Sequence, residues 1–185
     1  MASTVLDSAL FRDSFGTPAM RAIFEDAALL ARYTEVEMAL ARAQGRLGVI
    51  PAQAAKDIAA QCDAAKLDLA RLKKETEVVG YPILPLVRQL AAQCGEAGKF
   101  LHWGATTQDI MDTAMILQIK EALAIIEERL AGLARVLSEI LLASASLSSF
   151  CGVSHPRHSL AFLITVTLRG LPSAPYLSFS SRPHC

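Results

Sequence analysis

The chain has 185 residues, and its 18 lysines and arginines balance 18 aspartates and glutamates, so the formal net charge is zero. Nucleic-acid-binding proteins usually carry a basic excess or stripe, and its absence argues against that class. The composition is 52% hydrophobic but only 6% aromatic, and it is rich in alanine and leucine. This balance predicts an all-α protein.

The sequence gives no sign of export or of a membrane span. The opening residues MASTVLDSALFRD lack the basic start and long apolar run of a signal peptide. No uninterrupted apolar stretch reaches the roughly 20 residues that cross a bilayer. The four cysteines are scattered without CxxC spacing, which is typical of reduced thiols. We expect a cytoplasmic protein that contacts neither membrane nor nucleic acid.

Helical signals follow one another from residue 17 to residue 95. Thr17 and Pro18 are typical of a helix start, and apolar spacings of three and four predict one helix from there to Leu47. Gly48 and Pro51 end it. Shorter helices are expected over 51–62, 67–79 and 83–95. Together they predict an N-terminal helical domain over residues 1–105.

The longest predicted element is a helix within residues 106–143, the first long helix of a helical bundle. Its apolar residues alternate spacings of three and four, which is a heptad-like stripe. A helix of this length needs partner helices that the rest of the chain supplies poorly, so we expect a homo-oligomer. The stripe comprises Ile116, Ile119, Leu123, Ile126, Leu130, Leu133, Leu137 and Ile140.

Residues 144–185 differ in character and are expected to form a poorly ordered tail. The stretch is rich in serine and, towards its end, in proline. Within it, LAFLITVTL at 160–168 predicts a short strand or a buried helical piece.

Polar groups concentrate at residues 98–113, GKFLHWGATTQDIMDT. Thr106 is a plausible N-cap, and Asp109 three residues later nearly completes a capping box. Counting the apolar stripe backwards from Ile116 by four and then three gives Asp112 and Asp109. Both acids therefore continue the stripe, and each must meet hydrogen-bond donors, a cation or a water-filled cleft.

The same helix start also gathers an imidazole, hydroxyls and an amide. His102, Thr106, Thr107 and Gln108 lie where free backbone N–H groups favour anions. This arrangement predicts a carboxylate or phosphate site. A purely structural polar cluster is the alternative, and the residues alone leave both open.

The segment HWGATTQDIMDT at 102–113 resembles the first signature region of the fumarase/aspartase superfamily. It is similar to the branch of adenylosuccinate lyase and 3-carboxy-cis,cis-muconate cycloisomerase, which shows His-x-Gly-x-Thr-Ser-x-Asp and then Asp-Thr. The segments YTEVEMALARAQGRLGVIP at 33–51 and YPILPLVRQL at 81–90 resemble the same family. The resemblance extends over about residues 11 to 143, and its central motif is long enough to be specific.

The resemblance implies helical homotetramers whose active sites combine segments from three subunits. His102, Thr106, Thr107 and Gln108 would contact the carboxylates or phosphate of a small polycarboxylate substrate, and Asp109 would orient them. The family usually has serine where Thr107 stands, so the hydroxyl is kept and a methyl group is added. No metal and no organic cofactor is implied.

A second family segment, Gly-Arg-Thr-His-x-Gln-His-x-x-Pro, is partly matched at residues 152–161. By resemblance, His155 would be a general acid on the leaving group. The alternatives are a solvated turn or a metal site with Cys151 and His158, which lacks a convincing fourth ligand. Gly152 and His158 also match and Ser154 is conservative, whereas the mismatches are Val153, Arg157 and Ala161.

The resemblance implies a lyase or cycloisomerase acting on a polycarboxylate, most like 3-carboxy-cis,cis-muconate cycloisomerase. An adenylosuccinate lyase-like, fumarate-releasing enzyme is the alternative, weakened because Tyr81-Pro82 stands where relatives carry His-Asp or Asn-Pro before the signature. The family's Gly-Ser-Ser-x-Met-Pro loop, with its catalytic serine, has no counterpart in the chain. A truncated and inactive form that at most associates with full-length subunits is therefore also expected.

Overall fold

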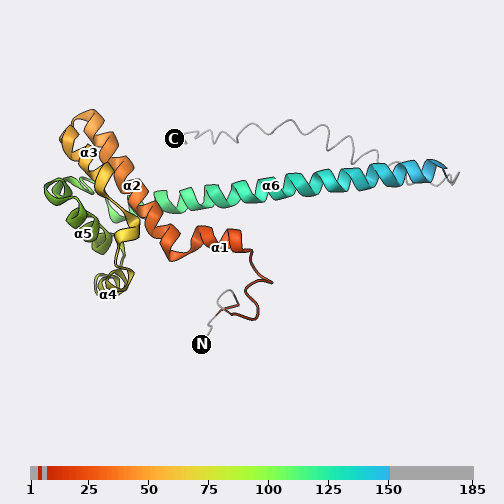
Figure 1. Ribbon diagram of the computed structural model, residues 1–185, viewed down its shortest axis with the longest axis horizontal. Helices are drawn as coiled ribbons and strands as arrows, with labels where there is room; N and C mark the ends of the chain where they lie inside the picture. Colours follow the sequence, from red (N-terminus) through yellow and green to blue (C-terminus); the bar gives the residue numbers. More distant parts are fainter. Residues whose placement is uncertain (1–3, 6–7, 151–185) are drawn as a thin grey trace, which may run out of the picture. The chain divides into compact units, whose positions relative to one another are not determined.

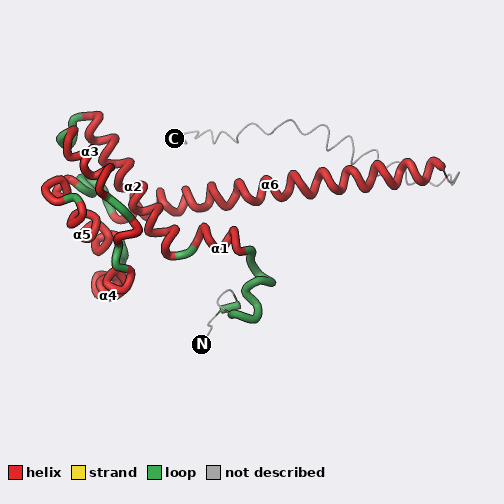
Figure 2. Tube along the Cα trace, in the orientation of Figure 1, coloured by secondary structure: helices red, strands yellow, loops and turns green. Residues whose placement is uncertain are grey.

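The computed structural model describes residues 4–5 and 8–150, with side chains described up to residue 144. Figure 2 shows that the regular elements of this part are all helical, and it contains no strand. The predicted all-α fold is therefore confirmed. The contacts divide the chain into two units, Met1–Ile126 and Glu127–Cys185. The tail was predicted from residue 144, but residues 144–150 are still helical; the rest of the tail, with the expected strand or helical piece at 160–168, lies outside the described residues.

The predicted helix from Pro18 to Leu47 is wrong in one respect, because it is interrupted at Glu25. Helix α1 spans Pro18–Phe24 and α2 spans Asp26–Leu47, while Glu25 between them is extended, with φ −73° and ψ 157°. The break leaves the Ile23 carbonyl free of helical bonding at the end of α1. The buried Gln118 side chain donates to that carbonyl through Nε2 at 2.6 Å. A contact distant in sequence thus stabilises the interruption.

Helices α2 and α3 (Ala52–Gln61) form an antiparallel hairpin and lie side by side (Figure 1). The chain leaves α2 through Gly48, whose backbone is left-handed, as the sequence predicted. The two helices pack tightly at Gly45, since a Cβ added there would lie 2.4 Å from the Cβ of Ala55. The absence of a side chain at Gly45 therefore sets the hairpin spacing.

Two glutamine side chains attach helix α5 (Ile83–Gln93) to the connections around α4 (Leu69–Val79). Gln93 accepts from the Asp63 amide at 2.8 Å and donates to its carbonyl at 3.1 Å. Gln89 accepts from the Asp68 amide at 2.8 Å and donates to its carbonyl at 3.2 Å. Each amide satisfies both backbone groups of one loop residue. Two short 3-10 helices complete this region, η1 (Ala64–Lys66) and η2 (Gly95–Phe100).

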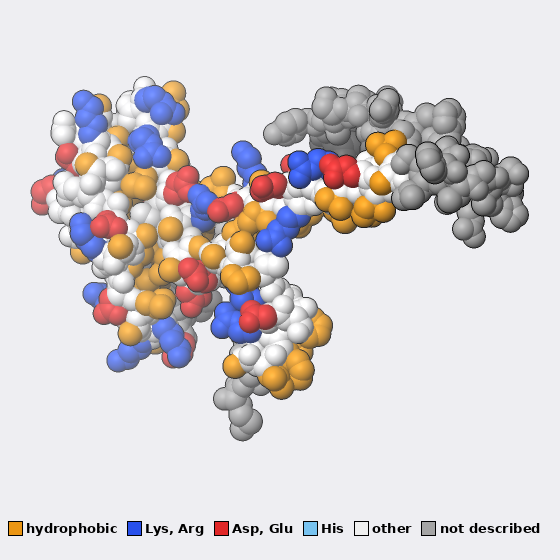
Figure 3. Space-filling view, turned by 45° about the vertical axis from the view of Figure 1, so that its right-hand side comes forward, with side chains coloured by type: hydrophobic (Ala, Val, Ile, Leu, Met, Phe, Trp, Pro, Cys, Tyr) orange, Lys and Arg blue, Asp and Glu red, His pale blue; other side chains and the backbone are white. Residues whose placement is uncertain are grey.

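The last described helix, α6, spans Thr107–Phe150 and presents two different faces. In the first unit its buried face consists of Ile110, Ala114, Gln118 and Ala122. The Arg32 guanidinium on α2 adds a salt bridge to Glu121. The predicted apolar stripe is instead exposed, with Ile116, Ile119, Leu123 and Ile126 in the first unit and Leu130, Leu133, Leu137 and Ile140 in the second (Figure 3). None of the helices in the described part is both long and apolar enough to cross a membrane.

The tight packing at Gly45 yields a stability prediction. Gly45→Ala should lower the free energy of unfolding by about 1–3 kcal/mol, because the new methyl group forces α2 and α3 apart. The matched control is Gly132→Ala on α6, where an added Cβ meets nothing within 4 Å. That change should raise stability by roughly 0.5–1 kcal/mol through helix propensity. Thermal unfolding of both variants checks this, and a Gly45→Ala variant as stable as wild type would contradict it.

Candidate carboxylate site at the start of helix α6

The predicted site begins in the loop between η2 and α6, where the backbone takes an unusual course. His102 has φ +59°, which places a non-glycine residue in the left-handed region, and Gly104 has φ +69°. For His102 this conformation costs roughly 1 kcal/mol or more and persists only where surrounding contacts impose it. One such contact is the Gln44 side chain on α2, which donates through Nε2 to the Trp103 carbonyl at 2.6 Å.

The second contact joins His102 to a carboxylate inside the fold. His102 Nδ1 lies 2.6 Å from Oε1 of Glu37, a side chain on α2 with no exposed surface. The other oxygen, Glu37 Oε2, is buried and has no hydrogen-bond partner among the described residues. Burial raises the pKa of Glu37, and the hydrogen bond and charge of His102 oppose that rise. The site therefore contains a buried carboxylate–imidazole pair.

Glu37 was missed by the sequence reasoning, although a signal for it exists. The fully buried positions of α2 are Tyr33, Thr34, Glu37 and Ala41, which follow the spacing of one helical face. The row of apolar residues predicted from the sequence for this helix followed a neighbouring face and ended at Leu47, which is 79% exposed. A glutamate within the correct stripe indicates a buried acid that needs a partner.

The predicted capping box between Thr106 and Asp109 is present. The Thr106 amide and hydroxyl both donate to Asp109 Oδ2 at 2.8 Å, and the Asp109 amide donates to Thr106 Oγ1 at 3.3 Å. The backbone N–H of Thr106, followed by its hydroxyl, holds the pKa of Asp109 below its usual value. These bonds use the Asp109 carboxylate to fix the start of α6.

Asp112 meets a donor from its own helix. Gln108 Nε2 donates to Asp112 Oδ1 at 2.5 Å, one turn along α6. Both Asp109 and Asp112 are exposed, as is the apolar stripe that they continue. The sequence-based count therefore placed the two acids on the correct face of the helix. Gln108 is exposed and Thr107 partly buried beside them.

A small cavity of about 240 Å³ opens beside this loop. Its lining combines apolar side chains of α2 with the loop and the first turns of α6: Val36, Leu40, Gln44, Trp103, Gly104, Ala105, Asp109, Ile110 and Thr113. Gln44 Oε1 in this lining is buried and without a partner among the described residues. Of the predicted site residues Asp109 lines this hollow, whereas His102, Thr106, Thr107 and Gln108 are not part of its lining.

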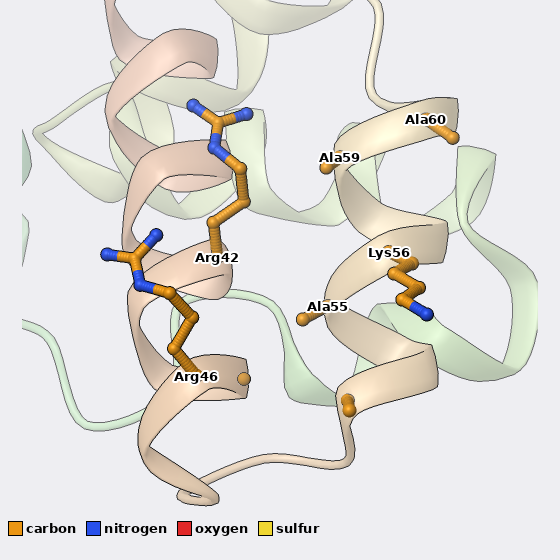
Figure 4. A pocket seen from close by; sticks show the side chains of 8 residues that line it. Arg42, Arg46, Ala55, Lys56, Ala59 and Ala60 are labelled. Atoms are coloured by element: carbon orange, nitrogen blue, oxygen red, sulfur yellow. The ribbon is translucent and has the colours of Figure 1, made fainter.

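A larger cavity, of about 620 Å³, lies between α2 and α3 and shares no lining residue with the smaller one. Figure 4 shows Ala55 and Ala59 pointing from α3 towards α2, from which Arg42 and Arg46 extend. Apart from these arginines and Lys56, the lining is alanine and glycine. This lining has no carboxylate, imidazole, hydroxyl or thiol group that could act as a base or nucleophile. The smaller cavity is therefore the candidate site.

The other potentially reactive side chains in the described part of the chain do not form a second candidate site. The thiols of Cys62 and Cys94 are buried with their sulfurs 3.4 Å apart, and burial raises the pKa of Cys62. They are therefore poor nucleophiles and serve as core residues. Within the described residues no three histidine, cysteine, aspartate or glutamate side chains gather as metal ligands. The predicted general acid His155 and its neighbours Cys151 and His158 lie outside the described residues.

Comparison with known proteins decides the family. A family model described as Lyase matches residues 13–145. The chain belongs to this lyase family. It is 48% identical over 119 residues to trans-aconitate decarboxylase 1 of Mycosarcoma maydis, covering 64% of this chain and 24% of that protein. It is 41% identical over 126 residues to N-acetyl-S-(2-succino)cysteine lyase of Dickeya dadantii (strain 3937), covering 68% of this chain and 28% of that protein.

A solved structure agrees with this assignment. The 3-carboxy-cis,cis-muconate lactonizing enzyme of Pseudomonas putida superposes with a TM-score of 0.69 at 38% identity, over 74% of this chain and 32% of the other. Other relatives of this chain are adenylosuccinate lyases and 3-carboxy-cis,cis-muconate cycloisomerases. The resemblance inferred from residues 102–113 is thereby confirmed. The chain spans about a quarter to a third of the length of these relatives.

The capping box yields a pH-dependent prediction. The folded-state pKa of Asp109 lies below its ordinary value of 3.8, so its stabilising contribution is present above that pH and is lost as the pH falls through the folded pKa. Wild type should therefore exceed Asp109→Ala in melting temperature at about pH 6 and lose that advantage towards about pH 3. Calorimetry across this range checks the trend. When Thr106→Val is also present, Asp109→Ala should lower the melting temperature by less than it does in wild type. A difference in melting temperature that does not change with pH would contradict the prediction.

Proposed function

We propose that this chain provides the carboxylate-binding segment of a lyase or cycloisomerase that acts on a small polycarboxylate, most like 3-carboxy-cis,cis-muconate cycloisomerase. The named substrates of its relatives support this, since trans-aconitate, 2-succino-cysteine and carboxymuconate all carry several carboxylates. A fumarate-releasing reaction like that of adenylosuccinate lyase is the alternative within the same chemistry.

The observation that carries the proposal is the fixed loop with donors at the start of α6. His102 is 21% exposed at its side chain while its Nδ1 is bound to a buried acid. Thr106, Thr107 and Gln108 follow at the positive end of the helix dipole, where an anion is favoured. In this proposal His102, Thr106, Thr107 and Gln108 contact the substrate carboxylates, and Asp109 orients them.

The chemistry proposed for this site is proton transfer next to a carboxylate. Removing that proton places a second negative charge on the carboxylate, and prepositioned donors stabilise the resulting dianion. Elimination then expels the leaving group, whereas a cycloisomerase runs the addition of a carboxylate across a double bond. His155, by resemblance, would protonate the leaving group in the elimination.

Ligand binding by the purified chain tests this proposal. Calorimetric titration with trans-aconitate and 3-carboxymuconate should show binding that His102→Asn weakens by about tenfold or more, because a charge-assisted hydrogen bond is lost. Lys56→Gln is the matched control, since it removes an exposed cation from outside the site and should leave the affinity unchanged. Equal binding by wild type and His102→Asn, or none by either, would refute the proposed site.

We also propose that the chain associates with further copies through the exposed stripe of α6. In the second unit Leu130 is 58%, Leu133 55% and Leu137 48% exposed. A heptad-like row of large apolar side chains is stable in water only when another helix covers it. The resemblance implies that other subunits complete the active site, and in that case activity requires association through this surface. A catalytically inactive chain would associate through the same surface.

Substitution within the stripe tests this association. Leu130→Glu combined with Leu137→Glu should convert the oligomer into a monomer, because carboxylates in a helix–helix seam lose their hydration. Arg135→Gln, an exposed change on the same helix, should leave the oligomer intact. Light scattering after gel filtration measures the mass. A wild-type monomer that melts cooperatively would contradict the proposal.

A further inference from the structure

Glu37 stands out as a buried acid whose structural benefit is small. One oxygen is bound to His102 and the other is unpartnered among the described residues, so the desolvation of the carboxylate is only half offset. The partner residue lies in left-handed backbone, which adds strain. A pair with an orphaned oxygen and a strained partner is a poor device for stability alone, whereas such features cluster where a side chain must be held in one state.

The geometry of the pair restricts what the His102 ring can do. A neutral imidazole carries one N–H, and the hydrogen bond made by one nitrogen determines the role of the other. Nδ1 lies 2.6 Å from Glu37 Oε1, so the two atoms share a short hydrogen bond. The His102 side chain is 21% exposed whereas Glu37 has no exposed surface, so solvent reaches part of the histidine and none of the acid.

We propose that Glu37 is a positioning residue that holds His102 with Nδ1–H donating to its carboxylate, so that Nε2 is the nitrogen presented to the ligand. When neutral, the ring then offers an unprotonated Nε2 as a proton acceptor, and when protonated it offers Nε2–H to a substrate carboxylate. Without Glu37 the ring would revert to the Nε2–H tautomer that a histidine side chain prefers in water. The identity of the anion at Nε2 rests on the proposed function, whereas the tautomer does not.

The other groups near the pair do not compete for Nδ1. The neighbouring acid on α2, Glu35, is engaged by Arg32 at 2.6 Å, and Asp109 accepts both donors of Thr106. Gln44, two turns beyond Glu37 on the same helix, gives its Nε2 to the Trp103 carbonyl, and its Oε1, unpartnered among the described residues, makes no hydrogen bond to His102. Glu37 is therefore the side chain that sets the His102 tautomer, and the bond at Trp103 keeps the loop in place beside it.

The test is a long-range proton–nitrogen NMR spectrum of the full chain with ¹⁵N-labelled histidine, with His102 assigned by comparison with His102→Asn. Wild type should show the Nδ1–H tautomer whenever the ring is neutral. Glu37→Leu should shift the tautomer ratio towards Nε2–H by at least about tenfold, because the charged acceptor is gone. Glu37→Gln should restore Nδ1–H, since its amide oxygen also accepts, and Glu35→Gln should leave the spectrum unchanged.

The outcomes separate this inference from the proposed function. An Nε2–H tautomer in wild type, with the Glu37 carboxyl donating to Nδ1, would overturn the positioning role even if Glu37→Leu failed to fold. An unchanged tautomer in a folded Glu37→Leu would also overturn it. If the tautomer behaves as expected but added trans-aconitate leaves the Nε2 resonance unmoved, the positioning role stands and the proposed carboxylate site fails.

Discussion

The loop before α6 is held against α2 by two polar contacts, and the rest of the site depends on them. Glu37 binds His102, and Gln44 two turns later binds the Trp103 carbonyl, so one face of α2 engages consecutive loop residues. These contacts fix where the chain turns into α6. The capping bonds between Thr106 and Asp109 then determine the first helical residue. Core packing alone would not orient the donors in this way.

Helix α6 distributes its side chains unevenly between its two faces. Within the first unit the buried face includes the small Ala114 and Ala122 and the polar Gln118, whereas the exposed stripe consists of leucine and isoleucine. Gln118 satisfies the carbonyl freed where α1 ends, and Glu121 on α6 pairs with Arg32 on α2. Because the largest apolar side chains face outward, most of the hydrophobic free energy of this helix remains available for association.

Local features of the fold could be predicted from the sequence, and distant contacts could not. The cap at Thr17, the end at Gly48 and the Thr106–Asp109 box depend on residues within one turn, so their spacing is informative. The break at Glu25 depends on Gln118, 95 residues away from Ile23, and the role of Glu37 depends on a histidine 65 residues later. The spacing of apolar residues along a helix does not indicate which helix face will contact a loop that is distant in sequence.

The strain at His102 fits a site that is organised before its ligand arrives. A flexible loop would have to order its donors on binding and would lose affinity to that entropy cost. Here folding has already set the backbone of His102 and buried the acid behind it, so under the proposed function the ligand would meet an imidazole that is already oriented. Under the proposed function, the contacts fixed in this way would recognise a carboxylate and not the group attached to it. The named substrates of the relatives share carboxylates but differ in their substituents, so the proposal assigns substrate discrimination to other segments of the active site.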